Sequence, residues 1–474
     1  MNSNLSFPEN AMKRALTIAL LVLSLSFAAA AQKQAPPAGG TPKPFTVPAA
    51  QHFTLPNGLK VTMVQYGQVP KVTISTIVDA GNINEGAEQV WLADLMGNLM
   101  KEGTQNRTSA QVDAAAAKMG GTLNVFVGAD QTTVVGDVLS EFGPAFVKLA
   151  AEVLQKPLFP ASEVERLKGD QLRNLTIAKS TPGAMANEKF RAILYPNHSY
   201  GRLYPTEAMI KSYDLAAVKK FYDDNYGAAR THVYVAGKFD AAAMKAAITG
   251  AYSAWKKGEP AKRDVPKTAG KRTLALIDRP GAAQSTVYVG LPVIDPSKPD
   301  YMALRVMNAI LGGSFGSRIT SNIREQKGYT YSPNSQLSAR YRDTYWVEVA
   351  DVTTAVTGPS LKEIFYEIDR LRKEPPSAAE LGGIKNYLGG IFVLQNSSRG
   401  GVINQLVFRD LHGLGEDYLP TYVQKIRAIT PEQVQQIAAK YINPDQMTIV
   451  VVGDKAKIAE QVAPYEKATA PGGN

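Results

Sequence analysis

An early segment of the chain, near residue 59, has a pattern typical of a folded domain, because apolar and polar residues alternate there. Apolar side chains occupy every second position in residues 59–63, directly after Asn57 and Gly58, and a β-branched run follows at residues 72–78. An alternating period indicates strands with one buried face, and an Asn-Gly pair beside such a segment is typical of a tight hairpin turn. The folded part is therefore predicted to open with paired strands.

The apolar period then changes to that of helices, with further strands between them. Residues 89–100 and 109–119 have helical spacing, Ser109 is expected to cap the second of these helices, and Gly120 is expected to end it. The remaining segments of the first half are helices at residues 145–154, 161–178 and 215–226 and strands at residues 122–126, 131–139 and 232–236. This order predicts an α+β fold, with a mixed, largely antiparallel sheet and helices packed on one face.

The second half of the chain repeats this order. Residues 210–237, which end in a strand closed by Gly237, match residues 426–453, which end in the same way at Gly453, at a constant offset of 216 residues. A repeat of this length is typical of a duplicated domain and not of a solenoid. We therefore predict two homologous domains. The predicted ranges are a first domain at residues 51–262, a linker at 263–272, a second domain at 273–462 and a flexible tail at 463–474.

Residues 1–31 have the pattern of an export signal. Lys13 and Arg14 precede an apolar run at residues 15–27, and four alanines then supply small residues for cleavage before Gln32. The run is shorter than the roughly 20 residues that a membrane-spanning helix needs, which favours a cleaved signal peptide over an N-terminal anchor. Residues 32–50, rich in Pro, Ala and Gly, are expected to form a flexible lead, and the protein is expected in the periplasm or outside the cell.

The composition fits a globular protein of more than one domain. The chain has 474 residues, of which 45% are hydrophobic and 20% are charged. Its formal net charge of +10 is spread along the chain, so nucleic acid is not an expected partner. No apolar run is long enough to form an integral membrane segment after signal cleavage. The absence of cysteine excludes disulfides, thiolate metal sites and Cys nucleophiles.

Common catalytic motifs are missing from the chain. The four histidines, His52, His198, His232 and His412, are never three or four residues apart, so a zinc site would need histidines from distant segments. No Walker loop, G-x-S-x-G elbow or G-x-G-x-x-G dinucleotide motif occurs. The segment GGSFGS at residues 312–317 lacks a phosphate-binding Lys, and we interpret it as a turn that ends a helix.

Several short motifs, taken in order, resemble those of the insulinase/pitrilysin family of zinc metallopeptidases. The resemblance covers nearly the whole chain after the signal, from LPNGL at residues 55–59 to VVVGD at residues 450–454. Between them lie GGTLN at residues 120–124, YGR at residues 200–202 and LGGSFGSR at residues 311–318. The chain is similar to the short form typified by the mitochondrial processing peptidase subunits, which implies two homologous α+β domains.

The zinc motif of that family is degenerate here. In the family, H-x-x-E-H supplies two zinc ligands one helical turn apart and a Glu that activates the metal-bound water. The aligned positions are Asp94, Gly97 and Asn98, and the third family ligand aligns with residues 172–175, which are Leu, Arg, Asn and Leu. One carboxylate and one amide rarely hold a metal unaided. The resemblance thus implies no cofactor in this chain and Zn in a catalytic partner.

One pair of family residues is retained. Arg324 and Tyr331, seven residues apart in IREQKGYTY at residues 323–331, match a pair that lies opposite the zinc and contacts the substrate. We expect Arg324 at a helix end and Tyr331 on the strand after Gly328, so that both side chains face one cavity. An Arg and a phenol there could stabilise negative charge on a peptide carbonyl. The alternative is a surface Arg and a packing Tyr.

A second feature concerns an edge strand. Asn124, Val125 and Phe126 match the family strand to which substrate peptides add through main-chain hydrogen bonds. The alternative is an edge strand that binds nothing.

These observations predict a non-catalytic, substrate-binding subunit of an exported heterodimeric zinc metallopeptidase that degrades or processes peptides. Its partner would be a homologous subunit with H-x-x-E-H, and this chain would assist the partner's zinc site without being active alone. The first alternative is a peptide-binding or scaffold protein with no role in proteolysis. The second, a hydrolase with a metal site of another kind, is disfavoured by the missing ligands. The peptide substrate and the identity of the partner are not given by the sequence.

Overall fold

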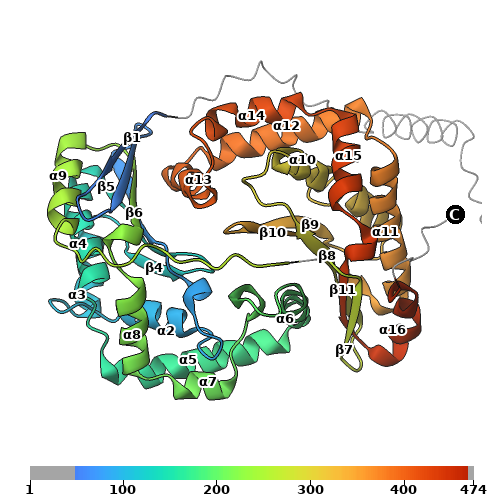
Figure 1. Ribbon diagram of the computed structural model, residues 1–474, viewed down its shortest axis with the longest axis horizontal. Helices are drawn as coiled ribbons and strands as arrows, with labels where there is room; N and C mark the ends of the chain where they lie inside the picture. Colours follow the sequence, from blue (N-terminus) through green and yellow to red (C-terminus); the bar gives the residue numbers. More distant parts are fainter. Residues whose placement is uncertain (1–47, 269, 468–474) are drawn as a thin grey trace, which may run out of the picture. The chain divides into compact units, whose positions relative to one another are not determined.

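Six strands form the first sheet, in the order β1-β2-β6-β3-β5-β4 (Figure 1). They are β1 (Ala50–Thr54), β2 (Lys60–Gln65), β3 (Lys71–Val78), β4 (Asn124–Val127), β5 (Thr132–Leu139) and β6 (Thr231–Gly237). Only β2 and β6 run parallel, and the other neighbours are antiparallel. The predicted hairpin joins β1 to β2. Gly58 provides its positive φ of 91°, and Asn57 Nδ2 donates to the Tyr252 carbonyl at 2.8 Å.

Five strands form the second sheet, in the order β7-β11-β8-β10-β9. They are β7 (Thr273–Asp278), β8 (Gln284–Val293), β9 (Asn334–Arg340), β10 (Asp343–Thr353) and β11 (Thr448–Gly453). Again one neighbouring pair, β7 and β11, is parallel and the rest are antiparallel. Apart from β1, the two sheets have the same strand order and directions, which confirms two homologous halves with mixed, largely antiparallel sheets.

Helices make up most of the remaining structure of both halves. The first half contains η1 (Asn82–Asn84), α2 (Leu92–Met100), α3 (Ser109–Lys118), η2 (Ser140–Phe142), α4 (Gly143–Gln155), α5 (Ala161–Ser180), α6 (Pro182–Leu194), η3 (Ser199–Gly201), α7 (Glu207–Ser212), α8 (Leu215–Asn225), η4 (Ala228–Arg230) and α9 (Ala241–Tyr252). The second contains α10 (Tyr301–Leu311), η5 (Thr320–Gln326), η6 (Thr354–Val356), α11 (Thr357–Lys373), α12 (Ala378–Gln395), α13 (Arg399–His412), α14 (Tyr418–Ala428), α15 (Pro431–Tyr441), η7 (Pro444–Gln446), α16 (Lys455–Val462) and η8 (Ala463–Tyr465). The expected cap of α3 was one residue off, because the Thr108 hydroxyl accepts from the Gln111 amide while Ser109 Oγ donates to the Lys101 carbonyl.

The computed structural model describes residues 48–268 and 270–467, all of which belong to one compact unit. The predicted signal peptide and nearly all of the predicted lead lie outside the described residues, as does the end of the predicted tail. The start of that tail is folded: Tyr465 is buried, its ring stacks on Phe365 and its hydroxyl donates to the Gly358 carbonyl at 3.0 Å. None of the helices in the described ranges is long and apolar enough to cross a membrane.

Helix α6 belongs to the first half by sequence but packs against the second sheet. The Phe190 ring is fully buried, 5.4 Å from the Tyr345 ring centroid and 6.0 Å from that of Tyr288. A Cβ atom on Gly290 would lie 2.8 Å from Phe190 Cζ, so the glycine makes room for this ring. The face that α6 covers therefore belongs to an apolar core shared by the two halves.

Helix α13 makes the reverse contact, from the second half to the first sheet. Arg399 donates through Nε and Nη2 to the two carboxylate oxygens of Asp137 on β5, at 2.9 and 3.0 Å. Tyr234 of β6 donates to Asp410 of α13 at 2.8 Å. Adding the 216-residue offset of the sequence repeat to the residue numbers of α6 gives nearly those of α13, so the two helices occupy equivalent positions in the two halves. Each sheet is thus covered on one face by helices of its own half and on the other by a helix of the opposite half.

Candidate functional site

Helix α2 carries the three positions of the degenerate zinc motif. Gly97 is buried, and Asp94 and Asn98 are half-buried on the same helix. A Cβ atom on Gly97 would lie 2.5 Å from Val127 Cγ2 of β4, closer than real Cβ contacts come. Val127 thus fills the space that a longer side chain at position 97 would need. A glutamate general base has no room there in this packing.

Asp94 is engaged in a pair of buried carboxyl groups that the sequence did not reveal. Asn82 Nδ2 donates to Asp94 Oδ2 at 2.7 Å and to Glu85 Oε1 at 3.1 Å, and the Ala93 amide donates to the same Glu85 oxygen at 2.9 Å. Burial, and then the charge of Asp94, raise the pKa of Glu85 to about 8. Burial also raises the pKa of Asp94. At neutral pH this pair therefore retains a proton.

Helix α5, which packs on α2, would carry the third ligand of the family. In residues 172–175, Leu175 is buried in the core, while Arg173 is exposed and paired with Asp170. One turn earlier, Gln171 donates through Nε2 to the Trp91 carbonyl at the start of α2, at 2.9 Å. The α5 face that meets α2 is therefore formed by apolar and amide side chains.

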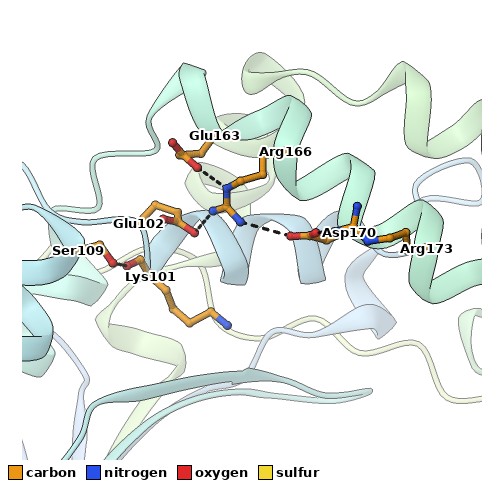
Figure 2. Close-up of polar contacts among 7 residues, drawn as sticks. All are labelled: Lys101, Glu102, Ser109, Glu163, Arg166, Asp170 and Arg173. Atoms are coloured by element: carbon orange, nitrogen blue, oxygen red, sulfur yellow. Dashed lines mark hydrogen bonds and ion pairs between the residues drawn. The ribbon is translucent and has the colours of Figure 1, made fainter.

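A cluster of charged side chains joins the C-terminal end of α2 to α5. Figure 2 shows Arg166 of α5 reaching Glu102, just after α2, and also Glu163 and Asp170 of its own helix. Arg166 is exposed, and the three carboxylates that it pairs with are half-buried. Figure 2 thus shows a charged cluster that joins the end of α2 to α5.

The residues of this region do not fit a zinc ion. Among residues 48–268 and 270–467, no three His, Cys, Asp or Glu side chains lie close enough to hold a metal. The position of the metal-activating Glu is filled by Val127, and Asp94 already accepts from Asn82. No metal-dependent step can be assigned to this chain's own residues.

Arg324 and Tyr331 lie together, as the sequence predicted. Both line a pocket of about 380 Å³. The Arg324 Cζ atom lies 5.2 Å from the Tyr331 ring centroid and 4.4 Å from that of Phe315. Tyr331 is 80% exposed and Phe315 is 72% exposed, so neither ring is a packing residue. The guanidinium thus lies between two aromatic rings at an open pocket, where cation–π attraction orients it.

The backbone around this pair differs from the prediction in two respects. Arg324 lies in η5, which is a π-helix and not the end of an α-helix. Tyr331 lies on a bend before β9 and not on a strand, directly after the isolated bridge between Thr330 and Val352. π-helical turns are rare and concentrate at functional sites, because the extra residue in the turn redirects side chains.

Hydrogen bonds hold both backbone segments in place. Asn322 of η5 donates through Nδ2 to Glu367 of α11 at 2.9 Å, and the Tyr329 amide donates to the Ile323 carbonyl at 2.8 Å. Thr330 Oγ1 donates to the Asp351 carbonyl of β10 at 2.7 Å. The half-buried Arg324 and exposed Tyr331 side chains therefore extend from an anchored backbone, which favours a defined geometry.

Strand β4 has the open edge that the sequence predicted, but its three residues differ in exposure. It is the last strand of its sheet, and within the described ranges no strand pairs with its outer edge. Asn124 and Phe126 are exposed, Phe126 by 59%, whereas the Val125 side chain is buried against the α2 layer. Only the main chain of Val125 can contact a peptide. No hydrogen bond or ion pair of the described residues joins β4 to Arg324 or Tyr331.

Two segments that together make up most of the described chain match known protein families. Residues 60–204 match insulinase (peptidase family M16), and residues 212–388 match the peptidase M16 inactive domain. The chain belongs to the insulinase family. Its zinc-motif positions are nevertheless Asp94, Gly97 and Asn98, so it is a peptidase homologue without the family's zinc-binding residues.

Several known proteins and solved structures resemble the chain over most of their length. An uncharacterized zinc protease of Streptomyces coelicolor is 23% identical over 395 residues, which cover 81% of this chain and 85% of that one. One of Bacillus subtilis is 22% identical over 401 residues, with 83% and 96% covered. The structure of a peptidase M16 inactive domain from Pseudomonas fluorescens superposes with a TM-score of 0.78 at 26% identity, covering 85% of this chain and 98% of that one. A protease from Helicobacter pylori superposes with a TM-score of 0.79 over 86% of this chain and all of that one, at 19% identity, which shows the fold alone.

The contact between Gly97 and Val127 leads to a stability prediction. Replacing Gly97 with Ala is expected to lower the free energy of unfolding by about 1 kcal/mol, since overpacking costs about 1–3 kcal/mol and the higher helix propensity of Ala offsets roughly 1. Denaturant unfolding of Gly97→Ala, Val127→Ala and the double variant measures the effect. We expect the double variant to be more stable than the sum of the single changes predicts. Additive changes would show that the two side chains do not compete for space.

Proposed function

We propose that this chain is the non-catalytic, substrate-binding subunit of an exported heterodimeric zinc metallopeptidase that degrades or processes peptides. The partner is a homologous insulinase-family subunit that carries H-x-x-E-H and therefore the zinc and the general base. This chain contributes Arg324 and Tyr331 to the partner's active site. The competing function is peptide binding or scaffolding without any part in proteolysis.

The observation that carries this proposal is the contrast between two regions of one chain. At the zinc-motif position, Val127 occupies the space beside Gly97, so this region is packed as core. At the second region, Tyr331 and Phe315 remain exposed and Arg324 is half-buried, and all three line an open pocket. Tyrosine and arginine side chains are enriched at the residues that dominate binding surfaces. This contrast supports lost catalysis with retained substrate contact.

The chemistry of the pocket fits an assisting role. Arg324 offers planar N–H donors and Tyr331 offers a phenolic O–H, and neither group must change protonation state to donate. Two such donors can bind a peptide carbonyl and stabilise negative charge that develops on its oxygen. The open edge of β4, with its exposed Asn124 and Phe126, supports binding of an extended peptide. Export is proposed from the signal pattern of residues 1–31 alone.

Co-expression with an H-x-x-E-H homologue encoded in the same genome tests the proposal. A tag on this chain should retain the homologue at one-to-one stoichiometry, and only the pair should cleave a peptide library in a chelator-sensitive way. This chain alone should contain no stoichiometric zinc by elemental analysis. Binding of the homologue without any gain in turnover would favour the scaffold function. One zinc per isolated chain with peptide hydrolysis would refute both functions.

A further inference from the structure

A larger pocket, of about 540 Å³, adjoins the Arg324 pocket. Helices α10, α12 and α13 and the last strand, β9, provide its walls, and Gly313, Asn334 and Tyr387 line both pockets. The proposed role of Arg324 and Tyr331 does not involve this larger pocket. Its lining is rich in amides, including those of Gln395, Asn404 and Gln405, and is therefore suited to a polar ligand.

Arg305 of α10 is the charged residue of this pocket. Of the side chains that line it within the described ranges, none is an Asp or a Glu. Arg305 Cζ lies 5.2 Å from the Tyr422 ring centroid, and in the described part of the chain no carboxylate forms an ion pair with it. Burial lowers the pKa of Arg305, but the phenols of Tyr422, Tyr418 and Tyr301 more than offset this, so the group remains a cation.

Several other buried or half-buried arginines of the protein bond to carboxylates or carbonyls, whereas the hydrogen-bond partner of Arg305 is the neutral phenol of Tyr418. Arg318 forms two hydrogen bonds with Glu380, at 2.8 and 2.9 Å, and Arg399 forms two with Asp137. Arg230 donates to the Glu259 carbonyl at 2.9 Å and also to two further oxygens. A phenol does not neutralise the charge of a half-buried guanidinium, and an anionic ligand in the pocket would do so.

We propose that this pocket binds a carboxylate of a peptide, with Arg305 as the counter-ion and the neighbouring amides as further donors. The proposal rests on the proposed function only in taking the ligand to be a peptide. A carboxylate accepts two parallel N–H bonds from one guanidinium, which gives both affinity and orientation. Because Tyr387 lines both pockets, a peptide held here can continue toward Arg324 and Tyr331. The carboxylate is either the peptide's C-terminus or an acidic side chain.

Fluorescence anisotropy with the purified full chain, without any partner, tests this site. Three octapeptides of alternating Thr and Val, each labelled at its N-terminus with the same neutral fluorophore, serve as probes: one with a free C-terminal carboxylate, one with a C-terminal amide, and one amidated with a single central Glu. We expect at least one carboxylate-bearing probe to bind about tenfold more tightly than the uncharged one. The first probe reports a C-terminal carboxylate and the third an acidic side chain. Equal affinities for all three, within about twofold, overturn the proposal.

Two variants of lining residues and one control variant test whether the preference for carboxylate-bearing probes arises in this pocket. Arg305→Met keeps most of the side-chain volume and should abolish the preference, whereas Arg427→Met, on the exposed surface of α14, should leave it intact. Asn404→Asp, at an exposed position of the lining, should weaken carboxylate binding through like charge, and it keeps the test valid if Arg305→Met does not fold. An unchanged preference in Asn404→Asp and in folded Arg305→Met refutes the site. Because no partner or turnover is involved, failure of the heterodimer proposal gives a separate result.

Discussion

Replacing Arg324 with Ala is expected to lower the turnover of the assembled peptidase by about 10²-fold to 10³-fold, or roughly 3 to 4 kcal/mol in transition-state stabilisation. The reason is that one oriented donor to the developing oxyanion would be lost while the partner's metal site is left intact. Tyr331→Phe, which deletes only the hydroxyl, should lower turnover in the same direction. Steady-state kinetics, with zinc content and heterodimer yield measured on the same preparations, provide the test.

Two controls separate a catalytic contribution from a general charge effect. Arg324→Lys keeps the charge but not the planar donor fork, so it should restore only part of the rate. Arg173→Ala removes an arginine whose side chain is 70% exposed on α5 and should leave turnover unchanged. If Arg324→Ala and Tyr331→Phe both retain turnover within about twofold of the parent, the pair does not assist catalysis and the subunit is a scaffold.

The contribution of Glu85 to the free energy of unfolding is expected to fall as the pH rises from about 5 to about 8, because on ionising Glu85 must lose a proton that the folded state holds. The pKa of Glu85 is about 8 in the folded protein, raised first by burial and then by Asp94, against an ordinary value of 4.5. Between these values the folded state binds more protons than the unfolded state, so stability decreases with pH by up to about 1.4 kcal/mol per unit. Glu85→Gln should therefore be more stable than the parent at pH 7.5 by about 2 kcal/mol.

Denaturant unfolding of both proteins at pH 5.5 and 7.5 measures this difference. Other groups also titrate: burial lowers the pKa of His232 to about 3 and that of His412 to about 4, so both histidines add stability as the pH rises toward 6.5. Both histidines are present in the parent and in Glu85→Gln, so their contributions to the pH dependence cancel when the two proteins are compared. Parallel pH profiles for the parent and Glu85→Gln would show that Glu85 is ionised in the folded state.

Much of the fold follows from local sequence patterns. The alternating residues of β2 and β3 and the helical spacing of α2, α4, α5 and α8 predicted those elements to within a few residues. The repeat at an offset of 216 predicted two halves, which the matching strand orders confirm. Helix α6 was missed although its buried residues have helical spacing, and its packing could not be predicted, because Phe190 contacts Tyr288 and Tyr345, which lie 98 and 155 residues later in the chain.

The candidate site was only partly accessible from the sequence. The spacing and family context of Arg324 and Tyr331 predicted that they share a cavity, and the pocket bears this out. The role of Phe315 was missed, because its segment was interpreted only as a turn that ends α10. Glu85 and Val127 carry no local signal at all, since their significance arises from Asp94 and Gly97 on another element. Tertiary packing, and not residue type, determines such pairs.

The exchange of α6 and α13 between the two sheets gives the chain the architecture of a homodimer fused into one polypeptide. A separate copy of either half would leave one sheet face bare, and in the second sheet that face includes Phe190's neighbours Tyr345 and Tyr288. Two free copies could cover these faces only by associating, with a stability that depends on their concentration. Joining them through the segment between β6 and β7 makes the association intramolecular. The fusion also allows the two copies to differ, so that one half has an open pocket at Arg324 while in the other Val127 occupies the space beside Gly97.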